Sequence, residues 1–162
     1  MHILGLDPGL ATTGYGIIDA QLGASKMITC GAIRTKADVP LAERLVVIYD
    51  QITFLLNTYH PEEAAVEQLF FNKNATSALT VGQARGVSLL CLSQHQLTVH
   101  EYTPLQVKSS LTGNGRADKS QVGFMVKALL NLREVPRPDD VADALAVAIC
   151  HSFHATSRIT HL

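Results

Sequence analysis

Four acidic residues are the side chains of this sequence best suited to carry out chemistry. Asp7 and Glu67 each follow a short apolar run, and Asp140 and Asp143 lie three residues apart near the end of the chain. Residues spaced by three share one face of a helix, about 4.5 Å apart along its axis at ~1.5 Å per residue. Clustered carboxylates suit Mg²⁺ or Mn²⁺, and two such ions about 4 Å apart can activate water and stabilise the leaving oxygen of a phosphodiester. The set therefore predicts hydrolysis rather than redox chemistry.

Hydrophobic periodicity predicts the elements that position these acids. Apolar alternation or short apolar runs favour strands, and apolar residues at helical spacing favour helices. We expect strands over residues 3–7, 15–20, 27–34, 64–68 and 97–102, and helices over residues 41–59, 74–94, 104–111, 119–132 and 139–154. This order predicts an α/β fold with a mixed sheet flanked by helices. Asp7 and Glu67 would then lie together, because each ends a strand at the edge where α/β sheets bind ligands.

A purely structural alternative explains the same acids one at a time. Asp7 can cap a turn, and Asp139, Asp140 and Asp143 suit a helix N-terminus. Residues 144–149 argue against this, because they are apolar on every side and indicate a buried helix, in which a carboxylate needs a partner. Spacing leaves one choice open, since Asp139 and Asp140 both share a helix face with Asp143.

Composition bounds the class of protein. With 162 residues and 47% hydrophobic content, we expect one domain over residues 1–162 whose core needs no disulfide or structural metal. The three cysteines include no CxxC pair, and we find neither a basic leader nor an apolar segment of membrane-spanning length. We therefore expect a cytoplasmic protein without a membrane association. The net charge is -1, but residues 104–138 hold six basic and two acidic residues, a local excess that favours phosphate binding.

Four sequence blocks extend these expectations by resemblance. In chain order they are LGLDPGLATTGYG, VEQLFFNKNATSALTVGQARG, QVKSSLTGNGRADKSQV and DDVADALAVAICH. Together they resemble the RuvC crossover-junction endodeoxyribonucleases over nearly the whole chain. The resemblance implies a ribonuclease H-like fold, a five-stranded mixed sheet with helices on both faces. It also implies resolution of Holliday junctions by symmetric paired nicks that leave 5′-phosphate ends, in DNA recombination and repair.

The resemblance assigns roles position by position. It makes Asp7, Glu67, Asp140 and Asp143 the catalytic metal ligands, holding two Mg²⁺ or Mn²⁺ ions. It favours Asp140 over Asp139, which stays a candidate for an outer position. It further implies a homodimer, four-way junction DNA as substrate and the RuvA–RuvB branch-migration complex as partner. By spacing, His151 lies about 12 Å along the helix from Asp143, so we expect a surface or packing residue.

Further residues are candidates for contact with DNA. Lys108 and Lys119 match lysines that the family uses near its active site, where a cation can stabilise a scissile phosphate; the alternative is a solvated helix face. Arg116 is a candidate for a backbone phosphate. The segment after Glu67 carries the remaining candidates, Phe70, Phe71, Lys73 and Asn74. Exposed rings can stack on unpaired bases, and Phe70 matches the family's stacking aromatic, with an ordinary core phenylalanine as the alternative.

Two other functions fit parts of the pattern. The opening strand and its DxG turn also resemble actin-like and sugar-kinase nucleotide-binding domains, but no second copy of that motif is present. A junction-binding module that has lost its chemistry is the other alternative, and the presence of all four acids argues against it. Ala78, Gly82 and Gly86 recur every four residues and form a flat stripe on which another helix can pack, either within the chain or in a dimer.

Overall fold

A single five-stranded sheet organises the protein. The computed structural model describes residues 1–69 and 75–159. The strands are β1 (His2–Asp7), β2 (Thr12–Gln21), β3 (Ala24–Arg34), β4 (Glu63–Glu67) and β5 (Thr98–Tyr102), in the spatial order β3-β2-β1-β4-β5. Strand β2 is antiparallel to both β1 and β3, whereas β4 runs parallel to β1 and β5. The sheet is therefore mixed, as the sequence predicts.

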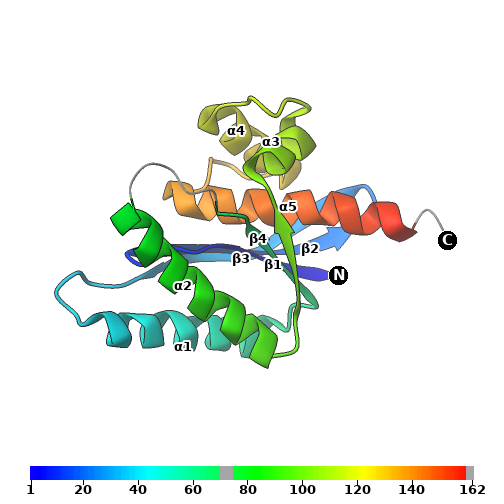
Figure 1. Cartoon of the computed structure of the whole chain (residues 1–162). Coiled ribbons are helices and arrows are strands. Elements are labelled where there is room, and N and C mark those ends of the chain that lie inside the picture. Colours follow the sequence, from blue (N-terminus) through cyan, green and yellow to red (C-terminus); the bar gives the residue numbers. More distant parts are fainter. Residues whose placement is uncertain (70–74, 160–162) are drawn as a thin grey trace.

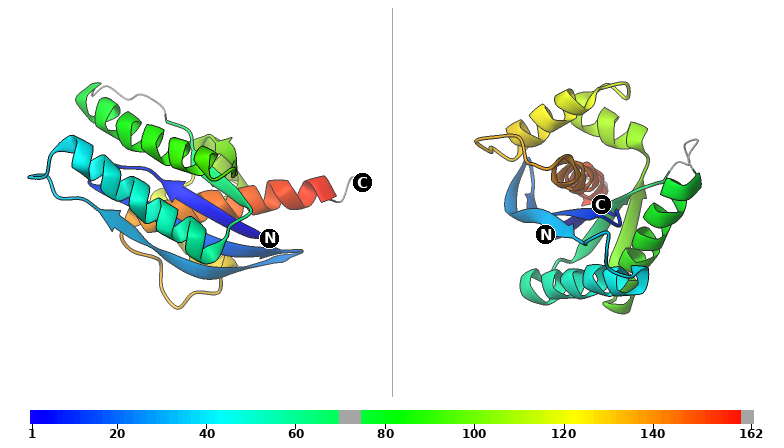
Figure 2. Two further views of the ribbon diagram at one scale, coloured as in Figure 1. Left: turned by 90° about the horizontal axis from the view of Figure 1, so that it is seen from below. Right: turned by 90° about the vertical axis from the view of Figure 1, so that its left-hand side faces the viewer.

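Helices cover both faces of this sheet. They are α1 (Leu41–Tyr59), α2 (Ala75–Gln94), α3 (Pro104–Thr112), α4 (Lys119–Leu129) and α5 (Asp139–Ile159). Figure 1 shows α1 and α2 on one face and α5 on the other, with α3 and α4 stacked on the far side of α5. The end-on view in Figure 2 shows α5 enclosed between the sheet and the α3–α4 pair. Within the described residues, no helix combines the length and apolar character needed to span a bilayer.

The two-residue period of the strands sorts side chains between these two layers. On β1, Ile3 belongs to the buried cluster that contains Leu145 of α5, whereas Leu4 belongs to the cluster that contains Ile48 of α1. Because alternate residues point to opposite faces, Asp7 lies on the same side of β1 as Ile3. The first catalytic candidate therefore faces α5.

The same alternation orients β4. Ala65 packs in the cluster with α5, and its neighbours Ala64 and Val66 pack on the α1 side. Glu63 and Glu67, two residues to either side of Ala65, therefore both face α5. This places one glutamate at each end of the strand beneath the same helix.

Helix α5 contacts the sheet backbone directly. Its residues 144–149 are at most 1% exposed, which confirms the buried helix expected from their apolar sequence. A Cβ added at Gly5 would lie 2.0 Å from the carbonyl oxygen of Ala144, and one added at Gly14 would lie 2.0 Å from that of Asp140. Since real Cβ atoms never approach this closely, glycine is required at both positions. The contact sets the height of the first turns of α5 above β1 and β2.

Element boundaries differ from the sequence prediction at a few places. Helix α4 ends at Leu129 rather than at residue 132, because Asn131 adopts a left-handed conformation (φ 51°) and the Leu132 amide donates to the Lys127 carbonyl. Such a bond closes a helix in the Schellman manner. The β2–β3 hairpin is longer than predicted, because the turn at residues 22–23 is tight enough for Gln21 to pair with Ala24.

Candidate active site

Asp7 is the centre of the acidic cluster. Burial is the main cause that raises the pKa of Asp7 from its ordinary value of 3.8 to about 7. The negative charges of Asp143, Asp140 and Glu67 raise this pKa as well, in that order of size, and the charge of Lys119 lowers it. Charges act through a poorly solvated medium over longer distances than through water. The other three predicted acids therefore all lie near enough to Asp7 for their charges to act on it.

Glu67 and Asp143 show the same perturbation. Burial raises the pKa of Glu67, and the charge of Asp143 raises it further, while Lys108 and Lys119 oppose the shift. Burial also raises the pKa of Asp143, although the ion pair with Lys119, 3.3 Å between Nζ and Oδ2, opposes it. Half-buried carboxylates with like-charged neighbours are costly unless cations join them. Because their donors are hard oxygens, this cluster fits Mg²⁺ or Mn²⁺.

Asp139 and Asp140 have different surroundings. The Asp139 carboxylate is 57% exposed and accepts a hydrogen bond from Nη1 of Arg137 at 2.7 Å. Asp140 lies less exposed, with its backbone against Gly14, and its charge acts on Asp7. The charge of Asp140 thus reaches both Asp7 and Asp143, whereas that of Asp139 raises the pKa of Asp143 and is not among the charges acting on Asp7.

Two capped helices position the lysines. Thr103 and Gln106 form a capping box at the start of α3, which carries Lys108. Asp118 and Gln121 form a second capping box at the start of α4, whose first residue is Lys119. The two lysines, Glu67 and Asp143 line one hollow of about 230 Å³, together with Pro104, Val107, Val122 and Ala146. Cations and carboxylates therefore face the same space, large enough for solvent and part of a phosphate.

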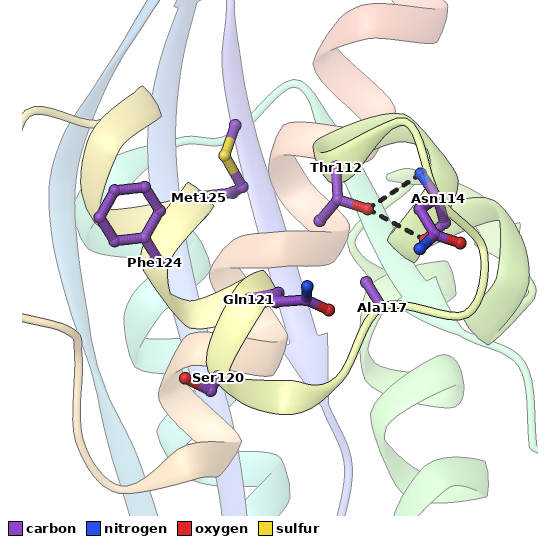
Figure 3. Close-up of a pocket in the computed structure, with 7 residues that line it drawn as sticks. All are labelled: Thr112, Asn114, Ala117, Ser120, Gln121, Phe124 and Met125. Carbon is purple, nitrogen blue, oxygen red and sulfur yellow. Dashed lines mark hydrogen bonds between the residues drawn. The ribbon is translucent and has the colours of Figure 1, made fainter.

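A larger hollow lies on the outer side of the α3–α4 pair. Its volume is about 520 Å³, and Figure 3 shows the residues that line it, Thr112, Asn114, Ala117, Ser120, Gln121, Phe124 and Met125. The Thr112 hydroxyl closes the turn beneath it by accepting from the Asn114 amide and donating to the Asn114 carbonyl. This hollow contains none of the four acids. Its residues offer neither a nucleophile with a base nor a set of metal ligands.

The remaining DNA candidates have separate placements. Arg116 is exposed on the turn between α3 and α4. Phe70, Phe71, Lys73 and Asn74 lie outside the described residues. Their predicted contacts with bases and phosphates therefore stay predictions.

A second polar cluster, which the sequence analysis missed, lies under α5. His151 is fully buried; its Nε2 contacts Oε2 of Glu63, and its Nδ1 shares a hydrogen bond of 2.7 Å with the Tyr102 hydroxyl. The Nε2 atom of His100 lies 3.2 Å from the same Glu63 oxygen. His151 is thus a packing residue, one of the two roles expected for it. The sequence contains a signal for this cluster. Residues 63 and 67 share a strand face and residues 143 and 151 share a helix face, so the contact of Glu67 with α5 predicts a second contact between Glu63 and His151.

Hydrogen bonding decides how this second cluster is interpreted. Glu63, His100 and His151 each bring one ligand atom within 4.8 Å of the others, a spacing that a metal ion could use. However, both ring nitrogens of His151 are already engaged, Nε2 by Glu63 and Nδ1 by the Tyr102 hydroxyl. The His100 ring stacks on His151, with centroids 4.2 Å apart and planes at 20°. We therefore interpret Glu63, His151 and Tyr102 as a hydrogen-bonded part of the core, on which His100 packs.

Comparisons with known proteins identify the family of this chain. The model of the family described as "Crossover junction endodeoxyribonuclease RuvC" matches residues 3–151. Proteins of that name from Pelotomaculum thermopropionicum and Caldicellulosiruptor saccharolyticus are 56% and 51% identical to this chain, covering 96% and 97% of it and 95% of their own length. The solved structure "T. thermophilus RuvC in complex with Holliday junction substrate" superposes with a TM-score of 0.93 at 34% identity, covering 98% of this chain and 96% of its own.

Proposed function

This chain belongs to the RuvC family of crossover junction endodeoxyribonucleases, and we propose that it resolves Holliday junctions by nicking two strands symmetrically, in DNA recombination and repair. The single observation that carries the proposal is the convergence of charge on Asp7, whose pKa is raised to about 7 by burial and then by Asp143, Asp140 and Glu67. A protein that gathers buried carboxylates gains stability only when cations bind them. The T. thermophilus relative, solved with a Holliday junction, supports the choice of substrate.

Asp7, Glu67, Asp140 and Asp143 would hold the metal ions, two Mg²⁺ or Mn²⁺ per site. When bound, such ions lower the pKa of water and stabilise the charge that develops on the leaving oxygen of a phosphodiester. The four carboxylates come from β1, β4 and α5, three elements that pack through the core. The protein thus supplies a rigid set of ligands rather than one assembled on a loop, which favours a fixed attack geometry.

The basic residues act on the substrate. Lys119 is 73% exposed and holds Asp143 only by a surface ion pair, so it is free to turn to the scissile phosphate when DNA arrives. Lys108 faces the same hollow and stabilises charge on that phosphate. Arg116 contacts the backbone outside the cut site. Phe70, Phe71, Lys73 and Asn74, which follow Glu67, meet the junction bases and flanking phosphates.

The decisive experiment compares two aspartate-to-asparagine variants on a four-way DNA junction with Mg²⁺. We expect paired nicks from the wild-type protein, and junction binding without nicking from Asp7→Asn. Asp50→Asn is the matched control, because it makes the same chemical change at an exposed residue of α1, on the sheet face opposite α5 (Figure 1), and it should nick normally. Nicking by Asp7→Asn would refute the assignment of Asp7. Nucleotide hydrolysis by a wild-type protein that leaves junctions intact would favour the nucleotide-binding alternative.

We also propose a homodimer, since a two-fold symmetric junction is matched by two sites related by the same symmetry. The face of α2 that carries Gly82 and Gly86 is open around both glycines, and Leu79 and Leu90 on that face are 65% and 53% exposed. Gly86→Glu should shift sedimentation from dimer to monomer and replace paired nicks by single ones. Ala128→Glu adds the same charge at an exposed position of α4 and should leave the dimer intact. A wild-type monomer would refute the proposal.

The wider setting follows from family membership. We propose that residues 1–162 act as one nuclease domain in the cytoplasm, on junctions that the RuvA–RuvB complex presents. Co-elution of the protein with purified RuvA, RuvB and a four-way junction tests the partnership. Failure to enter that complex, with junction binding by the protein alone intact, would contradict it.

A further inference from the structure

We propose that Arg85 is a positioning residue for the metal site, which holds the end of β4 so that Glu67 stays in the acidic cluster; this rests on the proposed function. Nη1 of Arg85 donates to the backbone carbonyl of Glu67 at 2.6 Å. Nη2 pairs with Oε2 of Glu101 at 2.7 Å. The guanidinium, carried by α2, thus joins the end of β4 to β5.

The Glu67 carbonyl needs this donor because of where the strand ends. Pairing between β1 and β4 runs only as far as Leu6 and Val66, whereas Glu67 still pairs with Tyr102 of β5. The end of β4 is therefore held by the β5 ladder on one side, where the Gln68 amide donates to the Tyr102 carbonyl. Arg85 supplies a second anchor. Holding the carbonyl restricts the backbone torsion ψ of Glu67 and keeps its Cα–Cβ bond directed toward the acidic cluster.

Burial and pairing separate this role from DNA binding. The Arg85 side chain is only 12% exposed, and its charge already faces the Glu101 carboxylate. A phosphate ligand would need an accessible cation, as the exposed Arg116 and Lys119 offer on the surface. The fork of a guanidinium suits two acceptors on adjacent strands, whereas the single ammonium of lysine is a point donor. The geometry therefore matches arginine for holding two strands at once.

The position of Arg85 also relates two other parts of the proposed function. Arg85 lies next to Gly86, on the helix whose outer face we assign to the partner subunit, while its neighbour Ala84 is fully buried in the core. In sequence, Glu67 and Arg85 flank the segment proposed to meet junction bases. A shift of α2 on binding DNA or a second subunit would thus reach Glu67 through a direct contact.

The test measures metal binding and cleavage separately. Arg85→Ala should weaken Mn²⁺ affinity, followed by electron paramagnetic resonance, and slow single-turnover nicking by about 10- to 100-fold each, the usual effect of losing a group that orients a metal ligand. Junction affinity measured in Ca²⁺ should not change. Arg85→Lys keeps one donor and should recover part of both losses. Glu101→Gln removes the ion pair but leaves the contact with Glu67, so its loss should be smaller than that of Arg85→Ala.

Arg44→Ala is the matched control, since it removes another partly buried arginine, bonded to Thr35 away from the acids, and it should leave Mn²⁺ affinity unchanged. Wild-type Mn²⁺ affinity in Arg85→Ala would overturn the inference. Equal losses of junction affinity and nicking would make Arg85 a DNA ligand instead. A lowered melting temperature without recovery by Arg85→Lys would reduce its role to packing. If the wild-type protein fails to nick junctions, the proposed function falls, but the Mn²⁺ affinities still decide the role of Arg85.

Discussion

The two ends of β4 carry the same residue type under the same helix, and their surroundings are opposite. Glu67 faces the acidic cluster, where burial raises its pKa and the charge of Asp143 raises it further. Glu63 faces imidazoles, with His151 and His100 at its Oε2 atom. One end gathers like charge, and the other end matches a carboxylate with donors. An unmatched buried charge costs stability. The contrast therefore indicates that the Glu67 end of β4 binds a ligand and that the Glu63 end stabilises the fold.

Helix α5 makes the accumulation of acids tolerable. Asp140 and Asp143 lie in and just after its first turn, where the positive end of the helix dipole favours negative charge. His151, two turns further along, lies where that influence has faded and a hydrogen-bonded partner is needed instead. The first turns of α5 thus favour carboxylates, whereas its later turns do not.

The largest effect should come from removing each β4 glutamate in turn. Glu67→Gln should slow junction nicking at least as much as the roughly 10- to 100-fold typical of outer metal-site partners, without loss of stability. Glu63→Gln should keep nicking and lower the free energy of unfolding by about 1.5–3 kcal/mol, the usual worth of hydrogen bonds to a charged group. Single-turnover cleavage and urea unfolding measure the two. The contrast breaks down if Glu63→Gln abolishes cleavage in the folded protein.

A smaller effect should appear in the pH dependence of stability without metal. The folded-state pKa of Asp7, about 7, exceeds its ordinary 3.8, so ionised Asp7 disfavours folding; the cost is absent below the lower value and complete above the higher one. Asp7→Asn should therefore raise the Tm in EDTA at about pH 8 and not at about pH 4, by about 2–4 °C for each kcal/mol relieved. Mg²⁺ should shrink the difference. A stabilisation equal at both pH values would indicate another cause.

The smallest effect should come from the hydroxyl that orients His151. Tyr102→Phe removes the 2.7 Å hydrogen bond to Nδ1 and should cost about 0.5–1.5 kcal/mol in unfolding free energy, with nicking unchanged. Tyr49→Phe, which removes an exposed hydrogen bond to Gln94, is the control and should cost less. Equal losses in the two variants would mean that burial does not strengthen the histidine cluster.

Much of the fold was predictable because the apolar pattern is regular. The helix over residues 41–59 was predicted with the bounds of α1, and the strands ending at Asp7 and near Glu67 placed both acids at one sheet edge. Boundaries failed where the deciding feature has a weak sequence signal. The turn at Leu22 and Gly23 lacks the usual Asn-Gly or Asp-Gly signature, so β2 and β3 were predicted too short.

In the site, tertiary packing supplied what spacing lacked. Asp139 and Asp140 are equivalent by helical period, and they separate only because Asp140 lies against Gly14 while Asp139 pairs with Arg137. The role of Arg85 is not predictable from the sequence, because its partner is a backbone carbonyl and any residue has one. Sequence patterns thus located the acids, and only the structure located the groups that aim them.

The glycines under α5 have a consequence for redesigning this protein. A methyl group at Gly14 would act as a wedge between β2 and the Asp140 carbonyl, prising the α5 acids away from Asp7. A survey of inactive variants should therefore include changes that remove no oxygen ligand and add no charge. The metal preference of the protein could therefore be altered by changing the distance between α5 and the sheet at Gly5 or Gly14, as well as by changing the carboxylates themselves.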